Sequence, residues 1–161
     1  MRTQTIVESP IGPLTLVAED RVLAGCHMAV QRHAADTYGV PDEEGFEDAA
    51  RQLTEYFAGA RTEFDLELRM AGTPFQRRVW AALREIPFGE TESYGELAQR
   101  IGEPGGARAV GLANGRNPVA IIVPCHRVIG AGGSLTGYGG GLPRKQFLLD
   151  LEARVSGRTL I

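Results

Sequence analysis

The feature of this sequence that most constrains its fold is a change in the hydrophobic pattern near Ala71 and Gly72. Before this point, short runs typical of strands lie at residues 3–7, 14–18 and 22–28, and a turn rich in Pro and Gly joins the first two. After it, apolar side chains recur at helical spacing. We therefore expect two domains, residues 1–70 and residues 73–161.

The first domain is expected to be a small α/β unit. Apolar positions in residues 46–57 recur at helical spacing and predict a helix that ends at Gly59. Residues 64–68 alternate apolar and polar side chains, which predicts one more strand. The polar segment 31–44 is expected to be a loop.

The second domain is expected to be mainly helical. Thr73 followed by Pro74 is typical of a helix start, and this helix is expected to end at residues 87–89. Residues 93–96 have the capping-box form and open a short helix, and a glycine-containing turn separates it from another at residues 107–114. Two short helices joined in this way predict a helix-turn-helix, although many other helix pairs share the pattern.

The last elements follow this helix pair. Gly115 is expected to be the C-cap of the second short helix, and Val110 and Leu112 are expected to pack that helix against its neighbours. Residues 119–123 predict a short apolar strand, and a glycine-rich loop covers residues 130–141. Residues 147–155 predict a final amphipathic helix.

The two domains differ in charge. Residues 1–70 contain 6 basic and 13 acidic side chains, net −7, whereas residues 71–161 contain 11 basic and 7 acidic side chains, net +4. Between Arg100 and Lys145, six basic residues accompany a single acid, Glu103. Such a stretch fits an anion or nucleic-acid surface, although charge alone favours a solvated face.

The apolar stretches are short. The longest uninterrupted one is residues 119–123, and the first residues form no apolar signal region, so we expect a cytoplasmic protein. Cys26 and Cys125 lie far apart and in different contexts. A disulfide between them is not expected in a reducing compartment.

The most informative segment joins the Cys125 thiol, the His126 imidazole and the Arg127 guanidinium. A Cys thiol with a pKa of about 8.5 is mostly protonated at neutral pH, so a nucleophilic Cys needs a base, a positive charge or a helix N-terminus nearby. Adjacent helical residues do not face each other, so His126 would act through a bridging water. For an arbitrary Cys-His pair, a buried apolar Cys beside a hydrogen-bonded His is the alternative.

The sequence Pro-Cys-His-Arg-Val at residues 124–128 is identical to the active-site signature of the O6-alkylguanine-DNA alkyltransferases. Further motifs follow in the order and spacing of that family: Ser-Tyr-Gly-Glu at 93–96, Arg-Ala-Val-Gly at 108–111, Asn-Pro-Val at 117–119, and Gly-Tyr-Gly-Gly-Gly at 137–141 with Lys145. The chain thus resembles a bacterial member of this family, strongly over residues 73–155 and loosely before them.

The resemblance implies a role for each residue near the thiol. Cys125 would accept an alkyl group from O6 of guanine, His126 would take the thiol proton through water, and Glu152 would orient His126. Asn117 resembles a hinge between the recognition helix and the active-site strand, and an Asn-Pro turn is compatible with this role. Tyr94 resembles the tyrosine that donates a hydrogen bond or proton to N3 of guanine.

The resemblance also implies how the base is recognised. Tyr138 and the backbone amides of Gly139 and Gly140 resemble the loop that closes over the base and binds O6. Many relatives carry Ser where this chain has Gly139, so only the backbone part of that contact is implied. The carbonyls of Cys125 and Val128 would accept from the exocyclic amine of guanine.

DNA contacts are implied for the two short helices. Arg108 resembles the arginine finger that fills the space of a flipped-out nucleotide. Ser93 and Tyr94 match further DNA-binding positions. A stripe of small residues would allow close approach to the minor groove; it consists of Ala107, Gly111 and Gly115.

The family implies a ribonuclease-H-like fold for the α/β N-terminal domain and a winged-helix-like C-terminal domain. It implies a single-use DNA-repair methyltransferase, expected to be monomeric, that acts on double-stranded DNA containing O6-alkylguanine and, less efficiently, O4-alkylthymine. We expect no cofactor, since the thioether product makes the protein both reagent and single-use enzyme. We expect no metal, since Cys26, His27 and His33 do not supply four ligands. The alternatives are a non-catalytic lesion-binding protein, against which Cys125 argues, and a helix-turn-helix redox regulator.

Overall fold

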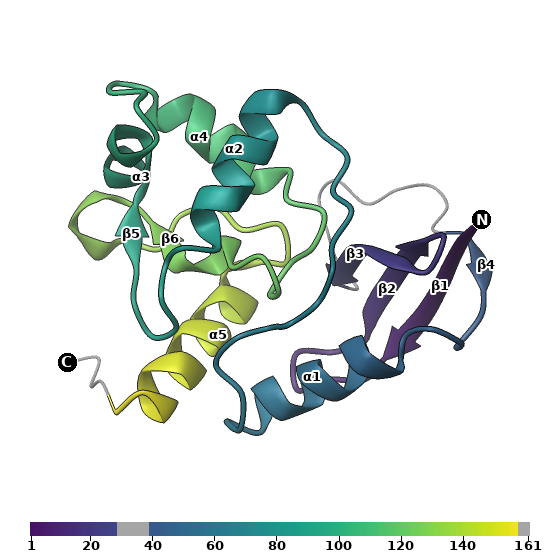
Figure 1. Cartoon of the computed structure of the whole chain (residues 1–161). Coiled ribbons are helices and arrows are strands. Elements are labelled where there is room, and N and C mark those ends of the chain that lie inside the picture. Colours follow the sequence, from purple (N-terminus) through teal and green to yellow (C-terminus); the bar gives the residue numbers. More distant parts are fainter. Residues whose placement is uncertain (29–38, 158–161) are drawn as a thin grey trace.

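The computed structural model describes residues 1–28 and 39–157 of the chain. Its strands are β1 (Arg2–Val7), β2 (Leu14–Glu19), β3 (Val22–Met28), β4 (Val40–Pro41), β5 (Glu92–Ser93) and β6 (Val128–Ile129). Its helices are α1 (Glu47–Phe57), α2 (Pro74–Leu83), α3 (Tyr94–Arg100), α4 (Ala107–Gly115) and α5 (Leu142–Val155), with 3-10 turns η1 (Cys125–Arg127) and η2 (Ala131–Gly133). Figure 1 shows an N-terminal α/β part beside a mainly helical C-terminal part, as the sequence predicts.

The N-terminal part is built on a four-stranded sheet in the order β3-β2-β1-β4. β1, β2 and β3 pair antiparallel, which confirms the predicted hairpin and third strand. β4 pairs parallel with β1 and lies within the segment predicted to be a loop, whose residues 31–38 fall outside the described part. Pro41 is compatible with this position because β4 is an edge strand, where a missing N–H costs no ladder bond.

The predicted strand at residues 64–68 is wrong. This segment makes one isolated bridge, between Leu68 and Leu23 of β3. The side chain of Gln52 instead binds the backbone of Asp65 twice, accepting from its N–H at 2.8 Å and donating to its carbonyl at 2.9 Å. The alternating apolar side chains still pack against the core. The alternation therefore indicates which side chains are buried, although the backbone of Asp65 is hydrogen-bonded to the Gln52 side chain and not to a neighbouring strand.

The predicted strand at residues 119–123 is also wrong, because the segment folds as a compact turn. Ile121 has φ of 74°, and the N–H of Ile122 donates to the carbonyl of Ala120 at 2.8 Å, which is the geometry of a γ-turn. All five side chains are buried. The turn is fastened to β3, since the N–H of Cys26 donates to Pro118 at 2.9 Å.

The helix starts predicted at Thr73 and Ser93 are confirmed, whereas the final helix begins at Leu142, before the predicted residues 147–155. Thr73 and Ser93 each cap a helix in a full capping box. α2 ends at Leu83, earlier than predicted, and α4 continues through Gly115, so Gly115 is not its C-cap. Leu112 is 70% exposed and does not pack as predicted, because it lies on the open face of α4.

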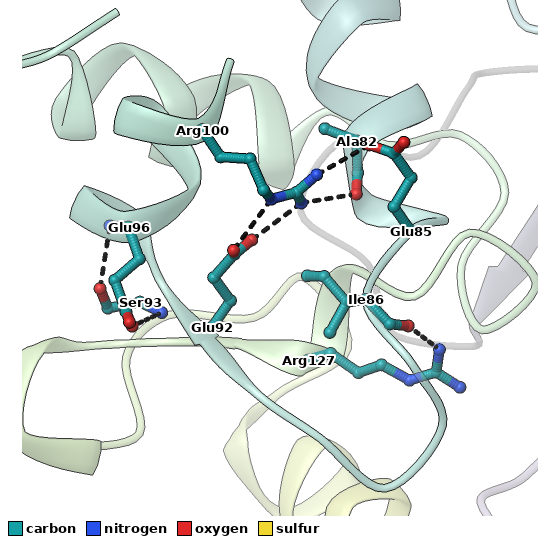
Figure 2. Close-up of polar contacts among 8 residues, drawn as sticks. All are labelled: Ala82, Glu85, Ile86, Glu92, Ser93, Glu96, Arg100 and Arg127. Atoms are coloured by element: carbon teal, nitrogen blue, oxygen red, sulfur yellow. Dashed lines mark hydrogen bonds and ion pairs between the residues drawn. The ribbon is translucent and has the colours of Figure 1, made fainter. Parts of the chain in front are cut away.

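Arg100, the last residue of α3, ties this helix to β5 and to the end of α2. Figure 2 shows Arg100 held by the Glu92 carboxylate, the Ala82 carbonyl and Glu85. Glu92 also belongs to β5, which pairs in parallel with β6 directly after η1. These contacts place the first residue of α3, Tyr94, close to the segment that carries Cys125.

One cluster of buried apolar side chains extends from the sheet through α1 into the helical part. It joins Leu16 of β2 and Leu53 of α1 to Val79 of α2 and Leu148 of α5. In the described ranges, we find no helix with the length and apolarity needed to span a membrane.

Candidate active site and DNA-binding surface

The thiol of Cys125 lies at the start of η1, between the γ-turn segment and β6. The residue is 6% exposed and borders a cavity of about 20 Å³. Asn117, Tyr138, Gly139 and Gly140 line the same cavity. The structure therefore brings together the predicted acceptor and the predicted base-binding loop.

Burial dominates the electrostatics of this thiol. It raises the pKa of Cys125, while the Asn117 amide, the Lys145 ammonium and the Tyr138 hydroxyl all lower it. The net pKa is above its ordinary value, so the resting thiol is protonated at neutral pH. A reaction at this sulfur therefore needs a proton acceptor.

His126 supplies an acceptor of the right form. Its Nε2 lies 2.6 Å from Oε2 of Glu152, and burial lowers the pKa of the imidazole. Because Glu152 is a carboxylate, Nε2 must carry the hydrogen in this bond, which leaves the lone pair of the neutral ring on Nδ1. Nδ1 is buried and has no hydrogen-bond partner among the residues that the structure describes. It is thus available to accept a proton, directly or through a water.

Glu152 stays ionised although it is only 1% exposed. Burial alone would raise its pKa, but attraction and hydrogen bonds from His126 and Arg127 hold the pKa well below its usual range. Arg127 donates from Nε to Oε1 at 2.8 Å, and the N–H of Gly89 donates to the same oxygen at 3.1 Å. Arg127 also donates to the Ile86 carbonyl, as Figure 2 shows, so it ties the carboxylate to the segment after α2.

Asn117 connects α4 to the segment before the thiol. Its side chain donates to the Val123 carbonyl at 2.8 Å and accepts from the Val119 N–H at 3.0 Å. It therefore bridges both ends of the γ-turn segment immediately after α4. An Asn-Pro turn and a hinge between α4 and the segment before the thiol would both use these two hydrogen bonds.

A groove of about 970 Å³ runs along the open face of α4. Arg108 is exposed in it, and Tyr94 lies on its wall with its hydroxyl accepting from Thr136 at 3.0 Å. Most predicted DNA-binding and base-binding residues line this groove: Tyr94, Ala107, Arg108, Gly111, Tyr138 and Gly139. Tyr138 and Gly139 also line the cavity at Cys125, so they separate the groove from the thiol.

Two residues predicted to bind DNA or the base, Ser93 and Val128, make hydrogen bonds within the protein. Ser93 does not line the groove, and its hydroxyl accepts from the Glu96 N–H at 3.0 Å as a helix cap. The Val128 carbonyl already accepts from Nζ of Lys145 at 2.7 Å. A carbonyl oxygen has two lone pairs, so a second donor at Val128 remains compatible with this bond.

Sequence reasoning missed four buried polar side chains of the site. Asn114 lines the cavity and donates to the Cys125 carbonyl at 3.3 Å. Lys145 is fully buried and joins Val128 to Thr136 of the glycine-rich loop. Arg127 and Tyr56 both bind Glu152. Lys145 and Arg127 lie within the family motifs, which could have pointed to them. Tyr56 lies at a position of α1 where the sequence pattern predicts only an apolar, buried side chain.

The second cysteine lies outside the cavity at Cys125. Cys26 is fully buried in β3, and burial raises its pKa to about 12. Among residues 1–28 and 39–157, no three His, Cys, Asp or Glu side chains gather in a way that could hold a metal ion, and His33 lies outside these ranges.

Together the fold and the site define a class of two-domain proteins in which a buried cysteine, paired with His and Glu, lies beneath a helix-lined groove. Two family models match the chain: "6-O-methylguanine DNA methyltransferase, ribonuclease-like domain" over residues 3–70, and "6-O-methylguanine DNA methyltransferase, DNA binding domain" over residues 74–154. The chain therefore belongs to the 6-O-methylguanine-DNA methyltransferase family.

Individual relatives agree with this assignment. A methylated-DNA–protein-cysteine methyltransferase of Mycobacterium bovis is 60% identical over 147 residues, which cover 91% of this chain and 89% of that protein. A methylated-DNA–protein-cysteine methyltransferase of Methanosarcina acetivorans is 54% identical over 152 residues, which cover 91% of this chain and 96% of that protein. The crystal structure of Mycobacterium tuberculosis OGT in complex with DNA matches with a TM-score of 0.91 and 58% identity, covering 95% of this chain and 94% of that one.

Proposed function

We propose that the chain repairs DNA by direct reversal, transferring an alkyl group irreversibly from O6 of guanine to Sγ of Cys125. Methyltransferase activity is consistent with the names of its relatives, which are methylated-DNA–protein-cysteine methyltransferases. The observation that carries the assignment to Cys125 is the free Nδ1 of His126, whose Nε2 is fixed on Glu152 beside the thiol. No cofactor takes part in the proposed reaction.

In the proposed reaction, the Cys125 proton passes through a water to Nδ1 of His126 as the sulfur attacks the alkyl carbon. A carbon–sulfur bond forms, the carbon–O6 bond breaks, and its electron pair moves onto the purine. The Tyr94 hydroxyl donates to N3 of guanine and stabilises this charge. The purine anion then takes up a proton, which in net terms replaces the one that Cys125 gave to His126, so the products are neutral guanine and a thioether. The thioether cannot react again, so each molecule reacts once.

The base would be held by the loop between the groove and the thiol. We propose that the backbone amides of Gly139 and Gly140 bind O6, that Tyr138 covers the base, and that the Val128 carbonyl accepts from the exocyclic amine. The cavity of about 20 Å³ is far smaller than a purine, so the loop has to move when a base enters. Lys145 holds this loop through the Thr136 carbonyl.

Double-stranded DNA is the proposed partner of the groove along α4. Arg108 is exposed there and has no ion pair among the described residues, so it is available to enter the base stack when the damaged nucleotide flips out. Ala107 and Gly111 keep the helix narrow at its contact with the minor groove. The M. tuberculosis relative is described in complex with DNA.

We assign residues 1–70 a ribonuclease-H-like fold and residues 73–161 a winged-helix-like, DNA-binding fold with α3 and α4 as its helix-turn-helix. We expect a monomer that also accepts O4-alkylthymine with lower efficiency. Because chromosomal DNA is the substrate, we place the protein in the bacterial cytoplasm.

The two alternatives are not favoured. A lesion-binding protein without activity has no use for a buried thiol paired with a proton acceptor. A redox regulator would need a Cys125 thiolate that oxidants reach, whereas this thiol is 6% exposed and its pKa is raised.

Replacement of Cys125 by Ser tests the acceptor directly. We expect the variant to lose methyl transfer from an O6-methylguanine duplex and to keep DNA binding, since the groove contacts are separate from the sulfur. Cys26→Ala, at the other buried cysteine, is the matched control and should keep transfer. Transfer by Cys125→Ser, or its loss in Cys26→Ala with normal folding, would contradict the assignment.

A further inference from the structure

In the proposed reaction, Glu152, His126 and Cys125 form a proton relay. The carboxylate of Glu152 also receives a hydrogen bond from Tyr56, which has no part in that reaction so far. The hydroxyl of Tyr56 donates to Oε2 of Glu152 at 2.6 Å, and the same oxygen lies 2.6 Å from Nε2 of His126. Tyr56 and His126 have no exposed surface, and Glu152 is 1% exposed. Nη2 of Arg127 donates to the same oxygen at 3.1 Å, so three donors from different residues share one carboxylate oxygen away from water.

Tyr56 comes from the other half of the molecule. It lies on α1, beside the sheet in Figure 1, and is 96 residues from Glu152 in sequence. Among the described residues, the other donors to Glu152 are Gly89, His126 and Arg127, which all belong to the C-terminal half. The Tyr56 ring packs against Phe57, Phe64 and Phe88, with centroids 5.3 to 6.1 Å apart, so the direction of its hydroxyl is fixed by three rings.

The hydroxyl has a defined chemical effect. A donor to a carboxylate oxygen takes up part of its negative charge, and less charge is then available to hold the proton on the imidazole. Burial and the charge of Glu152 keep the pKa of Tyr56 well above its ordinary value, so the hydroxyl remains a donor throughout the neutral range. The charged or titratable groups that face His126 are Glu152 and Lys145 from α5, Arg127 and Cys125 from η1, and Tyr56, which reaches it through Glu152.

We propose that Tyr56 is a positioning residue of the relay: by binding Oε2 of Glu152, it sets the pH range over which His126 accepts the Cys125 proton. The N-terminal half thereby tunes the reactivity of the thiol, in addition to supporting the fold. This inference rests on the proposed function, in which neutral His126 is the proton acceptor.

The test is the single-turnover transfer rate from an O6-methylguanine duplex, and from the free methylated base, measured against pH in Tyr56→Phe. This variant keeps the ring and its three aromatic contacts. Without the hydroxyl, Glu152 holds the imidazolium more strongly, so the acid limb of the rate profile should move upward by about half a pH unit. Glu152→Gln removes the charge and should move the limb in the opposite direction.

Leu53→Ala is the matched control on the same helix. Leu53 is 1% exposed and its apolar side chain has no hydrogen bond to offer Glu152 or His126, so this variant should melt at a lower temperature with the limb unmoved. If Tyr56→Phe does not fold, Phe64→Leu loosens one ring against Tyr56 and should move the limb upward by less. An unmoved limb in the folded variant would reduce Tyr56 to a structural role.

The same measurements separate this inference from the relay itself. If Glu152→Gln moves the limb and Tyr56→Phe does not, the relay stands and the role of Tyr56 is wrong. If neither variant changes the limb, the proton acceptor is not His126, and both proposals fail together.

Discussion

Methylation of Cys125 should lower the melting temperature of the protein by about 2 to 4 °C. The cavity at the thiol is about 20 Å³, enough for roughly one water, whose share of liquid volume is about 30 Å³. A methyl group of similar size nearly fits, so the cost should lie at the lower end of the 1 to 3 kcal/mol typical of overpacking, at about 1 kcal/mol. For a chain of this length, about 1 kcal/mol corresponds to about 2 to 4 °C.

The size of the alkyl group provides the internal comparison. A butyl group exceeds the cavity, so it should cost about 3 kcal/mol and lower the melting temperature by roughly three times as much. The assay is calorimetry of protein reacted to completion with matched O6-alkylguanine duplexes, after removal of the DNA. Cys125→Ala, treated in the same way, should show no change. An unchanged or higher melting temperature for the methylated protein would refute the reasoning, because it would mean that the closed site has spare volume.

Three further changes test the DNA contact, the helix-turn-helix and the buried imidazole. Arg108→Ala should lose more repair of duplex DNA than of the free methylated base, because only the duplex requires flipping, which costs a few kcal/mol. Arg100→Ala should lower the free energy of unfolding by about 1.5 to 3 kcal/mol in denaturant titrations, because it removes charged hydrogen bonds to Glu92 and to the Ala82 carbonyl. The free energy of unfolding should fall as the pH drops below 6.5, because burial lowers the pKa of His126 and the unfolded chain binds the proton first. His126→Gln should flatten this part of the profile.

Each of these three predictions has an outcome that would contradict it. Near-normal affinity in Arg108→Lys, with equal losses on duplex and free base in Arg108→Ala, would make the side chain a phosphate contact or a structural residue. Arg77 is exposed on α2, and Arg77→Ala should leave the free energy of unfolding unchanged. If both variants lose the same free energy of unfolding, the hydrogen bonds of Arg100 are not the cause of its loss. A wild-type pH profile in His126→Gln would show that other groups cause the acid loss.

The elements that the sequence predicts well have local causes. The capping boxes at Thr73 and Ser93 are complete within four residues, and they fix the starts of α2 and α3. The β1–β2 hairpin follows from alternation and a Pro/Gly turn. The thiol, imidazole and carboxylate could be named because their types match the chemistry of an activated nucleophile and because the motif around Cys125 is specific.

The features that sequence reasoning missed depend on contacts between distant segments. Residues 119–123 are as apolar as a strand, but Asn117 and β3 hold them in a γ-turn. Residues 64–68 alternate like a strand, yet Gln52 takes their backbone bonds. Tyr56 occupies an apolar position of α1, and only the packing of α1 near α5 brings its hydroxyl to Glu152.

Whether Cys125 is the single acceptor of the alkyl group can be measured by intact-mass spectrometry with peptide mapping. After incubation with a stoichiometric O6-methylguanine duplex, we expect a mass gain of one methyl group in place of one hydrogen, located entirely on the peptide that contains Cys125. A methyl group on Cys26 or on any other residue, or an unmodified protein together with repaired DNA, would contradict it.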